Sequence, residues 1–104
     1  MADPVPVILS PRAQADRDAC LTYLVDHHAY DAALAFLDRL DEALGTLAQF
    51  PQSGRAYAVT PSLTIRKANI RSFSERVFYV WDGSVVYVTR IISLRREVQP
   101  DDLI

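Results

Sequence analysis

The clearest pattern in the chain is an amphipathic helix that follows Asp31. Its apolar positions recur at i, i+3, i+4 and i+7, which places them on one side of a helix. They are Ala33, Phe36, Leu37, Leu40, Leu44 and Leu47. Asp31 is expected to cap the start of this helix, because its side chain can accept hydrogen bonds from free backbone N–H groups. The Phe50-Pro51 pair is expected to end it, since proline cannot continue a helix.

A second helix is predicted earlier, over residues 11–26 or 11–27. Ser10 can cap its first N–H groups, and Pro11 already has the backbone angle of a first helical position. The inward stripe of this helix is narrower and consists of Ala13, Cys20, Tyr23, Leu24 and His27. The charged residues 16–18 are expected to lie mostly outside the stripe.

From Leu63 onward the apolar period changes to two, which is typical of strands. Strands are predicted over residues 63–70, 76–81 and 84–93, and a short apolar run at residues 5–9 predicts one before the first helix. The element order is therefore β-α-α-β-β-β. This order predicts an α+β fold in which an N-terminal helical hairpin packs on one face of a small, mostly antiparallel sheet.

The Asp82-Gly83 pair is a strong hairpin signal, because a type I′ turn needs positive φ at both central positions. A two-residue turn here would pair Trp81 with Ser84. The same register would place Glu75 opposite Arg90, as a favourable cross-strand charge pair.

Length and composition fit one domain spanning residues 1–104. Half of the 104 residues are apolar, which suffices for a core without metal or disulfide support, and Cys20 is the single cysteine. The first ten residues do not resemble a signal peptide, and no stretch approaches the length of a membrane span. We therefore expect an intracellular, cytoplasmic protein.

The net charge of −2 conceals a marked asymmetry. Residues 1–54 hold three basic and eight acidic side chains, whereas residues 55–100 hold eight basic and three acidic ones. A basic second half of this kind favours an anionic partner, either phosphates or an acidic protein surface. The candidates for this contact are Arg66, Lys67, Arg71, Arg95 and Arg96. Strand arginines that only cover the helices remain the alternative.

No residue pattern predicts a catalytic centre, a cofactor or a metal. His27 and His28 are adjacent and would point about 100° apart on a helix, so they cannot easily share a metal. Cys20 lies at an inner helical position and is expected to be unreactive. The sequence contains neither a glycine-rich phosphate loop nor a nucleophile elbow.

Several segments resemble ParE-type toxins of the ParE/RelE superfamily, which are also described as plasmid stabilisation proteins. The resemblance begins with Leu9-Ser10-Pro11-Arg12-Ala13-Gln14-Ala15-Asp16 and includes Tyr23 in the first helix. It continues with Phe36-Leu37-Asp38-Arg39-Leu40, with the Phe50-Pro51…Gly54-Arg55 ending of the second helix, and with Arg76-Val77-Phe78-Tyr79-Val80. Together these segments cover roughly residues 7–97.

The resemblance implies the toxin of a type II toxin–antitoxin system that inhibits DNA gyrase and is not itself an enzyme. It also implies a ParD-like antitoxin as partner, with Tyr23, Phe36, Leu40 and Leu44 as candidate contacts. Two alternatives stay open: a ribosome-dependent mRNA endonuclease of the RelE kind, and a non-toxic module that only binds an antitoxin. Ser93 stands where the family pattern usually has a histidine, and this difference bears on the endonuclease alternative.

Overall fold

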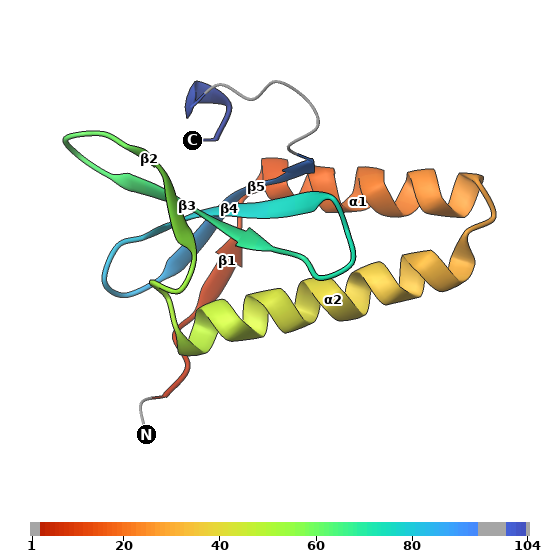
Figure 1. The fold of residues 1–104 in the computed structure, drawn as a ribbon, viewed down its shortest axis with the longest axis horizontal. Helices are drawn as coiled ribbons and strands as arrows, with labels where there is room; N and C mark the ends of the chain where they lie inside the picture. Colours follow the sequence, from red (N-terminus) through yellow and green to blue (C-terminus); the bar gives the residue numbers. More distant parts are fainter. Residues whose placement is uncertain (1–2, 94–99, 104) are drawn as a thin grey trace.

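The computed structural model describes residues 3–93 and 100–103, and its fold is the expected α+β class (Figure 1). One short strand precedes a helical hairpin, and the other four strands of the sheet follow it. The elements are β1 (Val7–Leu9), α1 (Pro11–Asp26), α2 (Tyr30–Gln49), β2 (Arg55–Val59), β3 (Thr64–Asn69), β4 (Glu75–Trp81), β5 (Val86–Ser93) and the short 3₁₀ helix η1 (Pro100–Leu103).

The sheet has the strand order β1-β5-β4-β3-β2, so the N-terminal strand and β2 lie at opposite edges. β1 runs parallel to β5, and the other neighbours are antiparallel. β2 was not predicted. Its side chains are mostly exposed and its register shifts between Ala56 and Ala58, so it lacks the alternation that marks a half-buried strand.

The two helix starts differ in how they are capped. The Ser10 hydroxyl accepts from the Ala13 N–H at 3.0 Å, and Pro11 is the first helical residue, as predicted. Asp31 as the cap of α2 is wrong, because this helix begins at Tyr30 and its cap position, Ala29, makes no side-chain hydrogen bond. The chain reverses between the helices at His28, whose φ of 56° lies in the left-handed region that often ends a helix.

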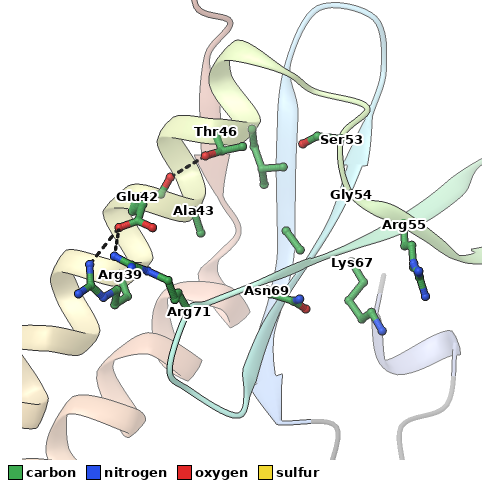
Figure 2. Close-up of a pocket in the computed structure, with 12 residues that line it drawn as sticks. Arg39, Glu42, Ala43, Thr46, Ser53, Gly54, Arg55, Lys67, Asn69 and Arg71 are labelled. Atoms are coloured by element: carbon green, nitrogen blue, oxygen red, sulfur yellow. Dashed lines mark hydrogen bonds and ion pairs between the residues drawn. The ribbon is translucent and has the colours of Figure 1, made fainter.

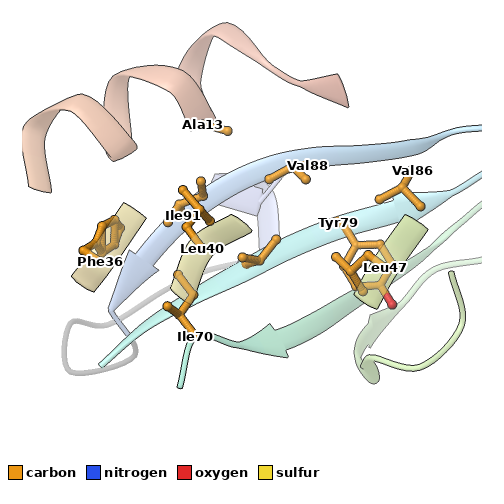
Figure 3. Close-up of a cluster of buried hydrophobic side chains, with 10 residues drawn as sticks. Ala13, Phe36, Leu40, Leu47, Ile70, Tyr79, Val86, Val88 and Ile91 are labelled. Atoms are coloured by element: carbon orange, nitrogen blue, oxygen red, sulfur yellow. The ribbon is translucent and has the colours of Figure 1, made fainter. Parts of the chain in front are cut away.

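The main core lies between the helical hairpin and one face of the sheet (Figure 3). Phe36, Leu40 and Leu47 of α2 are buried there, against Tyr79 and other residues of β4 and β5. The second face of the sheet carries a smaller cluster made of Ile65, Phe78, Ile92 and Leu103.

Two expected inward positions of α1 face solvent instead. Tyr23 is 61% exposed, and His27 is also exposed. Figure 1 shows that the joint between α1 and α2 extends beyond the sheet, so this end of the hairpin has no sheet beneath it. Conversely, Asp16 was expected outside and is largely covered, with a side chain that is 15% exposed.

The β4–β5 hairpin has a longer turn than predicted. Trp81 pairs with Val86, and the turn spans residues 82–85. The Asp82 carboxylate accepts from the backbone N–H groups of Ser84 and Val85, both at 2.8 Å, and these bonds hold the longer loop. The pairing of Glu75 with Arg90 is therefore wrong: Glu75 lies opposite Ser93, and a register shift between Phe78 and Tyr79 places Arg90 opposite Phe78.

Arg90 binds an aspartate of α1 instead of a strand neighbour. Its Nε and Nη2 donate to the Asp16 carboxylate at 2.7 and 3.0 Å, and its Nη1 donates to the carbonyl oxygen of Asp102 at 3.1 Å. The Asp16 carboxylate also accepts from the Ile91 N–H at 3.0 Å. These contacts raise the pKa of Arg90, mainly through the hydrogen bond to Asp16. They tie α1, β5 and η1 together.

Candidate binding groove

A groove of about 590 Å³ lies between the second half of α2, the turn before β2 and the edge of β3 (Figure 2). Four cationic side chains line it: Arg39 from α2, Arg55 from β2, Lys67 from β3, and Arg71 just beyond β3. Among the described residues that line it, Glu42 is the one carboxylate. We refer to this feature as the basic groove.

The turn that forms one end of the basic groove is fixed by a glycine. The Gly54 N–H donates to the hydroxyl oxygen of Tyr79 at 2.9 Å. A Cβ at this position would stand 2.6 Å from that oxygen and 2.9 Å from the Lys67 carbonyl oxygen, so only glycine fits without movement. Arg66 donates to the carbonyl oxygen of Gly54 at 3.0 Å. Burial raises the pKa of Tyr79, so its hydroxyl stays protonated as a hydrogen-bonding group at neutral pH.

Glu42 holds two arginines at the opposite end of the basic groove. Its Oε2 lies 3.0 Å from Arg39 Nη1 and 3.2 Å from Arg71 Nη2. Desolvation acts to raise the pKa of Glu42, but the hydrogen bonds and charges of Arg71 and Arg39 outweigh it and lower that pKa. The carboxylate therefore remains charged under neutral conditions.

Arg55 and Lys67 form the other cationic end. They are direct partners in the β2–β3 register. Lys67 Nζ lies 5.9 Å from the centre of the Tyr57 ring, which packs edge-on against Phe78 with ring centres 5.1 Å apart. Within residues 3–93 and 100–103, neither cation makes an ion pair or a side-chain hydrogen bond. This end therefore carries two positive charges without a compensating carboxylate.

The structure divides the five cationic residues that were predicted to bind a target. Lys67 and Arg71 line the basic groove. Arg66 instead holds the turn before β2, through its bond to Gly54. Arg95 and Arg96 lie outside the described residues. Arg39 and Arg55 were not nominated, although Gly54-Arg55 is part of the motif on which the family resemblance rests.

The predicted antitoxin contacts are divided in the same way. Phe36 and Leu40 are buried in the main core, and Leu44 is half-buried against it. Tyr23 is exposed, with its ring 4.1 Å from that of His27. A different set of apolar side chains faces solvent along α2 at i, i+4 and i+7; we call these residues, Tyr30, Leu34 and Leu37, the α2 stripe.

Cys20 and the two histidines make local contacts within the chain. Burial and the neighbouring Glu75 raise the pKa of Cys20 to about 11, so this half-buried thiol is protonated at neutral pH. His27 Nδ1 lies 2.8 Å from the Tyr23 carbonyl oxygen, and His28 Nδ1 lies 3.1 Å from the Tyr30 hydroxyl. In the part of the chain that the structure describes, no three His, Cys, Asp or Glu side chains converge as metal ligands do. Likewise, no helix among the described residues combines the length and apolar character of a membrane span.

The fold is similar to that of a solved structure. The chain is similar to a solved structure titled "Chromosomal ParDE TA system from P. aeruginosa", with a TM-score of 0.70 and 18% sequence identity over 88% of this chain and 98% of that chain. No curated protein sequence matches it. Residues 7–98 match the family described as ParE toxin of type II toxin-antitoxin system, parDE. The chain therefore belongs to the ParE toxin family, as the sequence resemblance implied.

Proposed function

We propose that this chain is a toxin that blocks DNA gyrase by binding to it and is held inactive by a ParD-like antitoxin in the cytoplasm. The observation that carries the proposal is the family match over residues 7–98, which covers every helix and strand from β1 to β5. The basic groove supports it, because its side chains supply charge and hydrogen bonds to a macromolecular surface.

The chemistry of the basic groove favours binding over catalysis. General acid–base catalysis needs a group whose pKa lies near the working pH. The Glu42 carboxyl has a lowered pKa, and the other ionisable groups that line the groove are arginines and a lysine, which are cations at neutral pH. Such a set positions and orients a partner.

The α2 stripe supports the antitoxin part of the proposal. Tyr30, Leu34 and Leu37 follow one another at helical spacing and are 55%, 64% and 37% exposed. An exposed row of apolar side chains at this spacing suits a partner helix that lays its own apolar face against it. Co-expression with the protein encoded by the neighbouring gene should yield a stable complex, which Leu34→Asp should weaken. If both proteins are soluble and do not co-purify, the antitoxin proposal fails.

Two assays run side by side test the target. The purified chain is added to gyrase on relaxed plasmid, and in parallel to a translation reaction with a reporter mRNA. We expect loss of supercoiling together with accumulation of cleaved plasmid, while the mRNA stays intact. Cleavage of the mRNA during translation would replace the proposal with the endonuclease alternative. A chain that binds the antitoxin and affects neither reaction would be a binding module.

The basic groove should matter for the activity and not for the fold. Lys67→Ala should reduce growth inhibition in cells that lack the antitoxin. Its melting temperature should stay close to that of the parent chain, because the half-buried Lys67 makes no ion pair within the described residues and a surface charge contributes about 0–1 kcal/mol. Arg12→Ala, an exposed arginine at the start of α1, is the matched control and should retain full toxicity. Equal toxicity of the two variants would exclude the groove as the target contact.

A further inference from the structure

The basic groove follows a stretch of β3 that β2 does not cover. In the β2–β3 register, Arg55 at the start of β2 lies opposite Lys67, so Ala68 and Asn69 continue β3 past the end of its neighbour. Both residues line the groove, and Ala43 and Leu47 of α2 stand behind them. The result is a channel along a strand edge with an apolar back wall, which is a shape that accepts an extended chain.

Both ends of this channel carry positive charge, but among the described residues a carboxylate binds the cation at only one end. Figure 2 shows Arg71 reaching toward α2, where Glu42 binds it, whereas Lys67 and Arg55 project together away from that helix. Two like charges at directly opposite positions in adjacent strands are unfavourable. An anion placed between Arg55 and Lys67 would remove this repulsion.

Glu42 shows what kind of group the channel holds. A carboxylate oxygen of Glu42 lies 3.2 Å from Arg71 and 3.0 Å from Arg39, and the three side chains are 35–63% exposed. An incoming carboxylate can therefore take the place of Glu42 on Arg71 without opening the core. Arginine also binds carboxylates with two parallel hydrogen bonds, which strengthens such an exchange.

We propose that the basic groove binds an extended acidic segment of a partner protein. One carboxylate lies between Arg55 and Lys67, and a second replaces Glu42 on Arg71. This assignment goes beyond the gyrase proposal and holds whichever macromolecule the toxin blocks, since it concerns only the chemistry that the groove recognises.

Charge around the channel favours a peptide over nucleic acid. Asp38 and Asp41 are exposed on α2, each next in sequence to a groove residue, and the whole chain has a net charge of −2. A phosphate backbone with a charge on every nucleotide would bring several phosphates against this acidic helix. A peptide with two carboxylates at the right spacing avoids that repulsion and fits a groove of about 590 Å³.

Fluorescence anisotropy with two labelled peptides tests the assignment. The probe is an eight-residue peptide of alternating Glu and Val, and the reference peptide has Gln in place of each Glu. We expect the Glu peptide to bind saturably and the Gln peptide not to bind. Arg55→Ala or Lys67→Ala should lower the affinity for the Glu peptide about threefold to tenfold. Arg12→Ala removes the same charge elsewhere and should leave the affinity unchanged. Equal binding of both peptides, or equal losses in all three variants, would overturn the assignment.

A gain of affinity provides a test that misfolding cannot imitate. Glu42→Gln frees Arg71 and Arg39 and should tighten binding of the Glu peptide about threefold. Asp41→Asn makes the same change in net charge one residue away and should have little effect, because no groove cation binds Asp41. Equal tightening by both variants would reduce the effect to long-range charge and overturn the assignment. Displacement of the peptide by a short oligothymidylate at a lower concentration would assign the groove to nucleic acid instead.

Discussion

Removal of the Asp16 carboxylate should destabilise the fold strongly. In the parent chain this carboxylate accepts three hydrogen bonds, two from the Arg90 guanidinium and one from the Ile91 N–H. Both side chains of the pair are largely covered, at 9% exposed for Arg90 and 15% for Asp16. Asp16→Ala leaves the guanidinium with the Asp102 carbonyl oxygen as its remaining acceptor within the described residues.

The size of the effect follows from this burial. Breaking a buried ion pair by removing one partner costs about 3–5 kcal/mol, because an uncompensated charge is left behind. The total stability of a domain is about 5–15 kcal/mol, so the loss is a large share of it. With a urea m-value of about 1.5–2 kcal/mol per molar, the unfolding midpoint should fall by roughly 2 M.

Urea unfolding followed by circular dichroism measures this shift, and the same helix supplies the control. Asp18 pairs with Arg17, but their side chains are 64% and 33% exposed. Asp18→Ala should therefore cost about 0–1 kcal/mol. A double variant, Asp16→Ala with Arg90→Met, should be more stable than Asp16→Ala alone, since it no longer buries an unpaired charge. A midpoint for Asp16→Ala that matches Asp18→Ala would refute the reasoning.

Four further variants test other parts of the fold by urea or thermal unfolding or by thiol alkylation. Gly54→Ala should destabilise the protein by about 1–3 kcal/mol, because the new Cβ overlaps the Tyr79 hydroxyl. Gly45→Ala should stabilise α2 by about 0.5–1 kcal/mol, because a Cβ there meets nothing within 4 Å. Stability changes of the same sign in the two variants would contradict this. Leu40→Ala should cost about 2–5 kcal/mol, and an unchanged melting temperature would show that this leucine is not core. Because the pKa of Cys20 is raised, the thiol of the folded protein keeps its proton between pH 9 and about 11, whereas the thiol of the unfolded chain has lost it. The contribution of Cys20 to the free energy of unfolding is therefore complete below pH 9 and is lost between pH 9 and about 11. Iodoacetamide should accordingly alkylate folded protein far more slowly than unfolded protein at pH 8.5, and Glu75→Gln should raise the folded rate; equal folded and unfolded rates would contradict the raised pKa.

Local patterns predicted most of the elements but not how they meet. The period of the apolar residues located both helices and three of the four strands that follow them, and Ser10-Pro11 marked the start of α1 correctly. The strand missed was β2, whose exposed edge position leaves no alternation to read. The hairpin register failed because side-chain acceptance by Asp82 lengthens the turn, and composition alone does not reveal that bond.

The charged residues were harder to place than the apolar ones. An aspartate on a helix and an arginine on a strand each have a solvated position as the default. The contact between Asp16 and Arg90 spans 74 positions in sequence, so the local sequence around either residue does not predict it. The cause of this contact is the topology of the sheet. β1 pairs with β5 only as far as Val88, so the backbone N–H and carbonyl groups that follow on this edge of β5 need other hydrogen-bond partners. Ser10 donates to the Thr89 carbonyl oxygen and Asp16 accepts from the Ile91 N–H, which completes that edge.

The alternation of side chains along a strand explains why one predicted target residue holds the turn before β2 instead. Arg66 is adjacent to Lys67, yet neighbouring strand residues point to opposite faces of a sheet. Lys67 pairs with Phe78 and lies over the Tyr57 ring on the second face of the sheet. Arg66 pairs with Tyr79 on the helix face and donates to the carbonyl oxygens of Gln52 and Gly54. The Gly54 N–H is meanwhile bound to the buried Tyr79 hydroxyl. The N–H and the carbonyl oxygen of Gly54 are thus both hydrogen-bonded, and Arg55 follows this turn directly. In the motif Gly54-Arg55, Gly54 therefore fixes the turn and Arg55 is the residue that the turn positions. This places a free cation opposite Lys67.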